Sequence, residues 1–215
     1  MLVGLILLFL LLFPTWALRD QSFLQQHRRN NMAPRTSLSA TSLASLGQDG
    51  SCKLAFIGCG TIAVAIATGL ATASDLNDIT IDRIGVSQRS AAKSAALAAQ
   101  FPNVVTVHTD NQELVDSADI VFVTVLPEQV NEVLQNLKFD PLRHVLVSLV
   151  SSSCLEDLVT CSGLPAESVF KMISLPSVAE QEGVCLLTPP TDNTVLLSLF
   201  ESLGGVVAAK DEAQM

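Results

Sequence analysis

One stretch, residues 54–69, constrains the fold of this chain more than any other, because an apolar strand pattern runs through a glycine turn into a helix of small residues. Gly58, Gly60 and Ala63 match the spacing G-x-G-x-x-A. The first glycine permits a tight turn, the second lets the backbone approach a diphosphate, and the alanine lets helix and strand pack closely. Amide N–H groups at the start of a helix attract phosphate. The stretch therefore predicts a dinucleotide-binding element with contacts from Gly58, Cys59, Gly60, Thr61, Ile62 and Ala63.

Short glycine patterns also occur in plain turns, so the surrounding pattern decides the interpretation. Strand patterns follow at residues 79–86, 104–107, 119–125, 144–150 and 169–173. Helix patterns occupy residues 90–101, 110–118, 127–137, 155–159 and 194–203. Asp110 is expected to cap its helix, and Pro127 to begin the next one. This regular alternation predicts a single α/β domain of the Rossmann type over residues 51–215, built on a doubly wound parallel sheet.

The chain begins with an unbroken apolar run over residues 2–13. Thr15 and Ala17 are small residues at the spacing of a signal-peptidase site, which predicts a cleavable secretory signal over residues 1–17. A membrane anchor is the alternative. Pro14 disfavours it, because the run is interrupted before it reaches the roughly twenty apolar residues of a span. No stable span is expected after cleavage.

Residues 18–50 have a different composition, rich in Ser, Thr, Asn and Gln, with Arg28, Arg29 and Arg35 and no acid between Asp20 and Asp49. This composition is typical of an organellar transit peptide. A disordered linker has a similar composition, and both interpretations stay open. A signal followed by a transit segment suits a plastid that is reached through the secretory route; a secreted or membrane-anchored protein is the alternative.

Charge and cysteine content exclude several classes of protein. Residues 51–215 contain 8 Lys and Arg against 19 Asp and Glu, which argues against nucleic-acid binding through bulk charge. The five cysteines have scattered spacings that match neither a metal site nor a disulfide framework, so we expect reduced and mostly buried thiols and no metal. His108 and His144 have no matched carboxylate or nucleophile nearby in sequence and are expected to be structural.

The end of the second predicted strand indicates which nucleotide binds. An NAD site usually has a carboxylate there to hold the ribose 2′-hydroxyl, but this chain has Ser87 and Arg89. A hydroxyl and a guanidinium suit a 2′-phosphate through charge-assisted hydrogen bonds. NADP(H) is therefore the predicted cofactor and NAD(H) the less favoured one. In the alternative interpretation Arg89 is a solvated residue at a helix start.

Ligands of doubly wound sheets bind at the carboxyl ends of the strands, so Val125, Leu126 and Pro127 are expected to face the cofactor. The serines that begin with Ser151 follow the next strand. They are donors to the cofactor or caps of the following helix, and both roles stay open.

With these segments in order, residues 53–215 resemble the amino-terminal domain of pyrroline-5-carboxylate reductase. The resemblance rests on Phe56-Ile-Gly-Cys-Gly-Thr-Ile-Ala63, Val86-Ser-Gln-Arg89, Asp110-Asn-Gln-Glu-Leu-Val115 and Ala118-Asp-Ile-Val-Phe-Val-Thr-Val-Leu-Pro127, with shorter matches at residues 147–148, 182–183 and 203–204. It implies NADPH contacts at Gly58 to Ala63, Ser87, Asn111, Val125 to Pro127 and Ser151. It also implies hydride transfer to the C=N carbon of a cyclic imino acid, as in proline biosynthesis.

Several departures from the family pattern concern the substrate. Leu126 stands where the family has lysine, Val150-Ser-Ser152 replaces its Ala-Ala-Gly turn, and Ile173-Ser-Leu-Pro-Ser177 replaces its Met-Pro-Asn-Thr-Pro loop. Another imine or a hydroxy acid is therefore an alternative substrate.

The chain stops at Met215, where the family enters a helical, dimer-forming second domain. The sequence is thus expected to be a truncated gene model or a non-catalytic NADP-binding module. A homodimer is expected only with that second domain. No catalytic residue is assigned.

Overall fold

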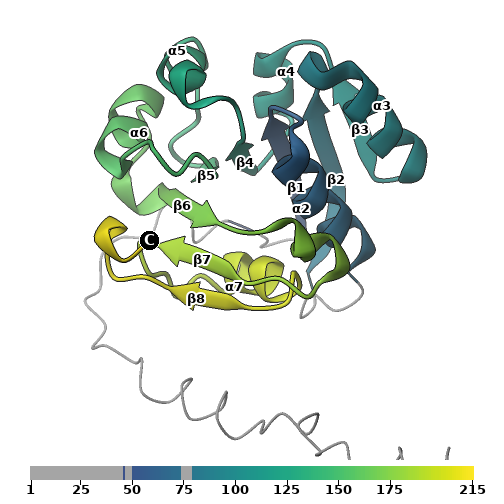
Figure 1. Cartoon of the computed structure of the whole chain (residues 1–215). Coiled ribbons are helices and arrows are strands. Elements are labelled where there is room, and N and C mark those ends of the chain that lie inside the picture. Colours follow the sequence, from purple (N-terminus) through teal and green to yellow (C-terminus); the bar gives the residue numbers. More distant parts are fainter. Residues whose placement is uncertain (1–45, 47–49, 74–78) are drawn as a thin grey trace, which may run out of the picture. The chain divides into compact units, whose positions relative to one another are not determined.

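Strand and helix alternate along the part of the chain that the computed structural model describes, which comprises Leu46 and residues 50–73 and 79–215 (Figure 1). The predicted signal peptide lies outside these residues, as does the transit-like or linker segment apart from Leu46 and Gly50. In residues 50–73 and 79–215, no helix combines the length and the apolar character that crossing a membrane requires. The α/β fold of the Rossmann type is confirmed.

Eight strands of the described chain form one sheet in the order β3-β2-β1-β4-β5-β6-β7-β8. They are β1 (Ser51–Ile57), β2 (Thr80–Ser87), β3 (Val105–His108), β4 (Ile120–Val123), β5 (Val145–Ser148), β6 (Val169–Ile173), β7 (Cys185–Thr188) and β8 (Val206–Ala208). The pairs among β1 to β6 are all parallel. Along the chain, β2 and β3 are added on one side of β1, and β4 and the later strands are added on its other side. Ligands of such sheets bind at this switch point, beyond the carboxyl ends of β1 and β4.

The predicted parallel arrangement is confirmed for β1 to β6, and two further strands that were not predicted, β7 and β8, run in the opposite direction. β7 pairs antiparallel with β6, and β8 is parallel to β7. Only the short 3-10 helix η4 (Pro176–Glu180) lies between β6 and β7, so the chain returns alongside β6 instead of crossing over to its start. The two missed strands have four and three residues, too few for a periodic pattern to identify.

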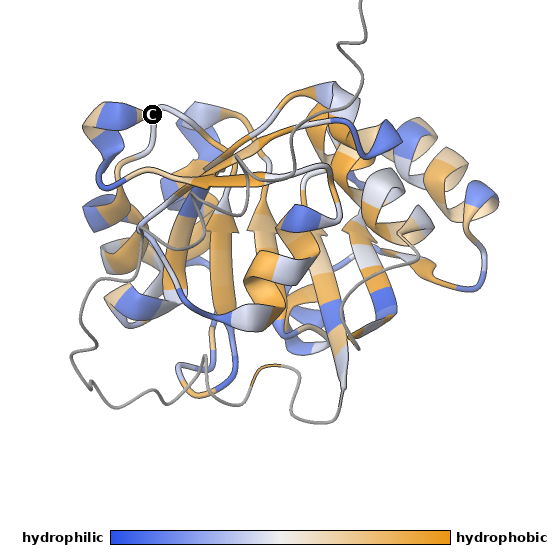
Figure 2. Cartoon of the chain, turned by 90° about the horizontal axis from the view of Figure 1, so that it is seen from below, coloured by the Kyte–Doolittle hydropathy of each residue, from blue (hydrophilic) through white to orange (hydrophobic). Residues whose placement is uncertain are grey.

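Helices cover both faces of the sheet, which is why the strands are mainly hydrophobic (Figure 2). They are α2 (Thr61–Thr72), α3 (Ala91–Gln100), α4 (Asn111–Asp116), α5 (Val130–Gln135), α6 (Leu155–Ser162) and α7 (Thr194–Glu201). One buried cluster joins α2, α3 and α7 to the sheet, and a second joins α4, α5 and α6. Alternate residues of β1 enter opposite clusters: Leu54 and Phe56 the first, Ala55 and Ile57 the second. The sheet is therefore doubly wound.

The local signals at two helix starts are confirmed. The Asp110 carboxylate accepts hydrogen bonds from the N–H groups of Gln112 and Glu113 at 2.7 and 2.9 Å, which caps α4. Pro127 begins the 3-10 helix η2 (Pro127–Gln129), which leads directly into α5. These two starts place the β3–α4 and β4–α5 connections at the carboxyl edge of the sheet.

Candidate functional site

The turn between β1 and α2 is held in place by its neighbours. Gly58 has φ +98°, a conformation that side chains rarely adopt, and a Cβ there would lie 2.7 Å from the carbonyl oxygen of Thr124. Its N–H donates to the Ser87 hydroxyl oxygen at 2.9 Å. Ser87 is 4% exposed, so it fixes the glycine turn from the end of β2. Ser87 was predicted to contact the nucleotide, and its contact with the turn was not predicted.

Thr124 holds the same turn from the end of β4, a role that has no local signal in the sequence. Its side-chain hydroxyl lies 2.9 Å from the carbonyl oxygen of Gly58 and 3.1 Å from that of Ile57. Its backbone N–H donates to the Ile57 carbonyl at 2.9 Å. Ile57 and Val123 are register partners in the sheet, so the two strands end side by side with Thr124 against the glycine. The turn is therefore held by side chains from the ends of two neighbouring strands, β2 and β4.

The start of α2 offers free backbone donors. Its N-cap is Gly60, which has no side chain to accept from the first-turn N–H groups, and the first turn contains no acidic residue. Those N–H groups are among the four at any helix start that have no partner within the helix. Ala63 is 1% exposed and packs into the core, as predicted for close contact between helix and strand. Cys59 is also buried, and Thr61 is exposed beside the open edge.

Lys93 of α3 lies at the same place and was not identified from the sequence. Its ammonium group donates to the Thr61 hydroxyl oxygen at 3.1 Å. Burial raises the pKa of the Cys59 thiol, and the positive charge of Lys93 opposes that rise, which puts the lysine within electrostatic range of the turn. A positive charge therefore stands beside the start of α2, where an anion would bind.

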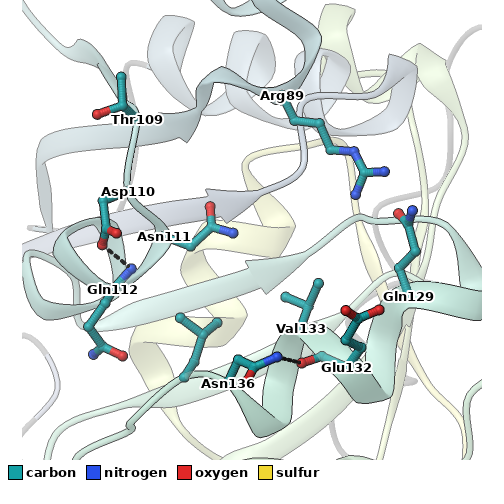
Figure 3. Close-up of a pocket in the computed structure, with 10 residues that line it drawn as sticks. Arg89, Thr109, Asp110, Asn111, Gln112, Gln129, Glu132, Val133 and Asn136 are labelled. Carbon is teal, nitrogen blue, oxygen red and sulfur yellow. Dashed lines mark hydrogen bonds between the residues drawn. The ribbon is translucent and has the colours of Figure 1, made fainter.

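A hollow of about 550 Å³ lies between the β3–α4 connection and the η2–α5 segment (Figure 3). Arg89, Asn111, Gln129 and Glu132 contribute to its lining, and in Figure 3 the Arg89 side chain extends toward Gln129. The structure thus brings together Arg89 and Asn111, two of the predicted site residues from different strand ends. The side-chain oxygen of Gln129 is buried without a hydrogen-bond partner within the described residues. A ligand that donates to this oxygen would satisfy it.

The remaining predicted residues lie at the ends of β4 and β5. Val125 is half-buried, whereas Leu126 (57% exposed) and Pro127 face solvent. Ser151 is also exposed, and its carbonyl oxygen accepts a hydrogen bond from the Lys171 ammonium group at 3.2 Å. The serines do not cap α6. Cys154 is the N-cap, and its sulfur accepts from the Asp157 N–H at 3.4 Å.

The buried His144 is structural, as predicted. The Nδ1 atom of buried His144 accepts from the Asp140 N–H at 2.9 Å, and its Nε2 atom lies 2.7 Å from the Arg143 guanidinium. Burial and the Arg143 charge lower the pKa of His144. His108 contacts the Thr106 hydroxyl at 3.2 Å. Among the described residues, no group of His, Cys, Asp and Glu is arranged to hold a metal ion.

Comparisons with known proteins agree with this geometry. Residues 53–152 match the family model described as NADP oxidoreductase coenzyme F420-dependent. Pyrroline-5-carboxylate reductase of Escherichia coli is 29% identical over 161 residues, which cover 71% of this chain and 56% of that protein. The chain is therefore similar to pyrroline-5-carboxylate reductase over part of that protein's length. It spans just over half the length of that relative.

Solved structures support the same fold. The pyrroline-5-carboxylate reductase of Streptococcus pyogenes superposes with a TM-score of 0.60 at 20% identity, over 74% of this chain and 59% of the other. The Plasmodium falciparum enzyme, whose structure has NADP bound, gives a TM-score of 0.60 at 21% identity, over 74% and 58% of the two chains.

Proposed function

We propose that this chain is an NADPH-dependent reductase of the pyrroline-5-carboxylate reductase type, which transfers hydride to the C=N carbon of a cyclic imino acid. The uncapped glycine turn between β1 and α2 carries the proposal. Bound NADPH would supply the hydride, and the chain would supply binding and orientation. Catalytic residues stay unassigned.

The turn fits a diphosphate in three respects. A Cβ at Gly60 would meet nothing closer than the Thr124 carbonyl oxygen at 4.0 Å, so there is open space where a phosphate must approach. The first-turn N–H groups of α2 have no side-chain cap. Lys93 adds a positive charge within reach of Thr61. Backbone donors, a helix start and a nearby cation together favour binding of an anion.

The hollow beside the turn suits the adenosine half of the cofactor. Arg89 supplies a guanidinium for a 2′-phosphate. The side-chain oxygen of Gln129, which has no partner among the residues that the structure describes, matches the donor of an adenine amino group. Arg89→Glu is expected to weaken NADPH binding by about a hundredfold and to change NADH binding by less than about threefold, because only NADPH carries the 2′-phosphate.

Isothermal calorimetry with both cofactors measures this preference. Arg83→Glu is the matched control, because Arg83 is an exposed arginine of β2 that lies at the opposite edge of the sheet from the glycine turn. It should leave both affinities unchanged. Equal losses of NADPH and NADH affinity in the Arg89 variant would contradict the NADP preference. Failure of the unaltered chain to bind either cofactor at millimolar concentration would contradict the proposed function.

Activity is tested by following NADPH oxidation with pyrroline-5-carboxylate. A second substrate class is favoured by the loop after β6, where Leu175 is 68% exposed at the edge that would face the substrate. The assay therefore includes 1-pyrroline, which lacks the carboxylate, and a hydroxy acid with NADP⁺. Turnover of pyrroline-5-carboxylate supports the leading proposal. Tight NADPH binding without any turnover favours a non-catalytic NADP-binding module.

We also propose that residues 1–50 direct the domain into the secretory route and then to a plastid. A fluorescent protein fused behind these residues tests this. Plastid fluorescence supports the proposal, and fluorescence at the cell exterior or in membranes supports its alternatives.

A further inference from the structure

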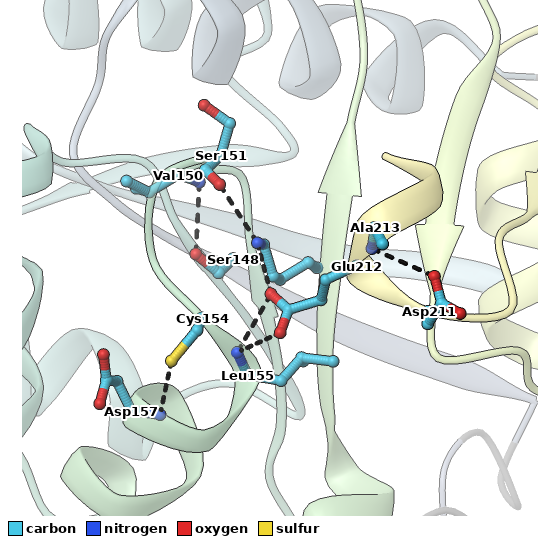
Figure 4. A network of polar contacts seen from close by, with 10 residues as sticks. Ser148, Val150, Ser151, Cys154, Leu155, Asp157, Asp211, Glu212 and Ala213 are labelled. Atoms are coloured by element: carbon cyan, nitrogen blue, oxygen red, sulfur yellow. Dashed lines mark hydrogen bonds and ion pairs between the residues drawn. The ribbon is translucent and has the colours of Figure 1, made fainter.

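An ion pair between a buried lysine and a partly exposed glutamate lies beneath the turn that follows β5 (Figure 4). Lys171 of β6 is 5% exposed, and its ammonium group donates to the Glu212 carboxylate at 2.6 Å. Glu212 begins the 3-10 helix η5 (Glu212–Gln214). Leu155 is the first residue of α6, and its N–H donates to the two Glu212 carboxylate oxygens at 3.1 and 3.2 Å. Three elements that are distant in sequence therefore meet at this pair.

The pair reaches the turn through one further hydrogen bond. The Lys171 ammonium group donates to the Ser151 carbonyl oxygen at 3.2 Å. Lys171 and Ser148 are register partners, so the lysine stands beside the last residue of β5. On the other side of the turn, the Val150 N–H donates to the Ser148 hydroxyl at 3.3 Å. The turn is thus held at two successive residues.

A buried lysine is costly unless its charge and its donors are satisfied. Here Glu212 balances the charge, and the Ser151 carbonyl takes a second donor. This second contact is the one that reaches the turn. The contact determines the direction of the peptide between Ser151 and Ser152.

In a trans peptide the carbonyl oxygen and the following N–H point in opposite directions. Because the Ser151 carbonyl points inward to Lys171, the Ser152 N–H points away from the ion pair. Ser152 is exposed, and no group in the described part of the chain accepts from its N–H. The turn lies at the carboxyl end of β5, next to the end of β4, since the Leu149 N–H donates to the Val123 carbonyl at 2.9 Å. The free donor is therefore presented at the edge where the nicotinamide half of a dinucleotide would lie.

We propose that Lys171, held by Glu212, is a positioning residue that orients the Ser151–Ser152 peptide so that its N–H donates to the nicotinamide half of bound NADPH. This inference rests on the proposed function, because it requires that the chain binds NADPH. It assigns the two halves of the cofactor to separate groups of residues: the glycine turn and hollow for the adenosine half, and the oriented peptide for the nicotinamide half.

The test compares a whole cofactor with half of one. Kd values are measured for NADPH and for 2′,5′-ADP, which keeps the adenosine and 2′-phosphate but lacks the nicotinamide. Lys171→Met removes the charge and the donors while keeping a long side chain. We expect it to weaken NADPH binding about tenfold and to change 2′,5′-ADP binding by less than about twofold. Lys171→Arg, which can donate to both partners, should restore NADPH binding.

Glu212→Gln provides a second variant should Lys171→Met fail to fold. It keeps an acceptor for Leu155 but removes the charge that holds Lys171, so an intermediate loss of NADPH affinity is expected with 2′,5′-ADP unchanged. Equal weakening of both ligands, or no change in either, overturns the inference. If the unaltered chain binds neither ligand, the proposed function fails instead, so the two failures are distinguishable.

Discussion

Gly58 and Gly60 are equivalent as letters of a motif, but the structure separates their roles. Gly58 has φ +98° and no room for a Cβ beside Thr124, so it is required by the fold. A Cβ added at Gly60 would have one neighbour within 4 Å, the Thr124 carbonyl oxygen at 4.0 Å. The fold therefore leaves open space at Gly60, where we propose that the diphosphate lies. The sequence motif predicted both positions, but only the contacts of Thr124 and Ser87 distinguish them.

Alanine substitutions at these two glycines should separate stability from binding. Gly58→Ala is expected to lower the free energy of unfolding by about 3 kcal/mol, because it adds backbone strain and a steric clash. Gly60→Ala should change it by less than about 0.5 kcal/mol, yet weaken NADPH binding more than about tenfold. Urea unfolding and calorimetry measure the two effects. If Gly60→Ala bound NADPH normally, the diphosphate could not lie against this turn.

A second residue-scale prediction concerns Glu212. Burial acts to raise the pKa of its carboxyl group, but the hydrogen bonds from Lys171 and Leu155 outweigh this effect and hold the pKa below the ordinary value of 4.5. A pKa that folding lowers contributes stability above the ordinary value, and that stability is lost as the pH falls through the folded value. The melting temperature of the unaltered protein should therefore exceed that of Glu212→Gln at pH 7.

This difference in melting temperature should shrink below about pH 4.5. Glu167→Gln, which changes an exposed glutamate in η3 (Ala166–Ser168), is the control for general effects of losing a carboxylate. A difference between Glu212→Gln and the unaltered protein that stayed constant from pH 7 to pH 3 would rule out the ion pair as its source.

At the scale of elements, the hydrophobic pattern of the sequence was sufficient to predict the strands that are buried beneath helices. The bounds of β6 were predicted as residues 169–173, which the structure reproduces as Val169–Ile173. By contrast, β7 and β8 have no local signal, because their identity comes from pairing with β6 and with each other. The cap of α6 was also not predicted, since Cys154 is an uncommon N-cap and serines precede it.

The contact between α2 and η4 provides a prediction at this scale. A Cβ at Gly69 of α2 would lie 2.2 Å from the Val178 carbonyl oxygen. Because Gly69 has no side chain, η4 can pack directly against α2. Gly69→Ala would gain about 1 kcal/mol in an isolated helix. Here we expect a net loss of about 2 kcal/mol, because backbone atoms of η4 must move.

Chemical denaturation of Gly69→Ala measures this balance between helix propensity and packing. Gly205→Ala is the control: a Cβ there meets nothing within 4 Å, so its stability should stay within about 0.5 kcal/mol of the unaltered protein. A stabilised Gly69→Ala variant would show that η4 does not pack against α2 as described.

At the scale of the whole molecule, the site is an assembly of strand ends that only the sheet order brings together. The glycine motif and Arg89 were predicted from local sequence signals, and Asn111 from the family resemblance. Thr124, Lys93 and the Lys171–Glu212 pair could not be predicted, because each acts through a contact with a residue at least 32 positions away in the chain. The contacts that support the site are therefore visible only in the folded structure, whereas the positions predicted to face the ligand are visible in the sequence motif.

The five free cysteines test the arrangement of the whole domain. Cys52, Cys59 and Cys185 are buried, whereas Cys154 and Cys161 are partly exposed. Burial raises the pKa of Cys59 and raises that of Cys185 to about 11, so neither forms much thiolate near neutral pH. Iodoacetamide at pH 8 should therefore modify Cys154 and Cys161 first, as followed by mass spectrometry, and all five cysteines only after unfolding in guanidinium chloride. Early modification of Cys185 would mean that β7 does not lie inside the sheet, and early modification of Cys59 would mean that the glycine turn is open. Both would contradict the structure on which the proposed cofactor site depends.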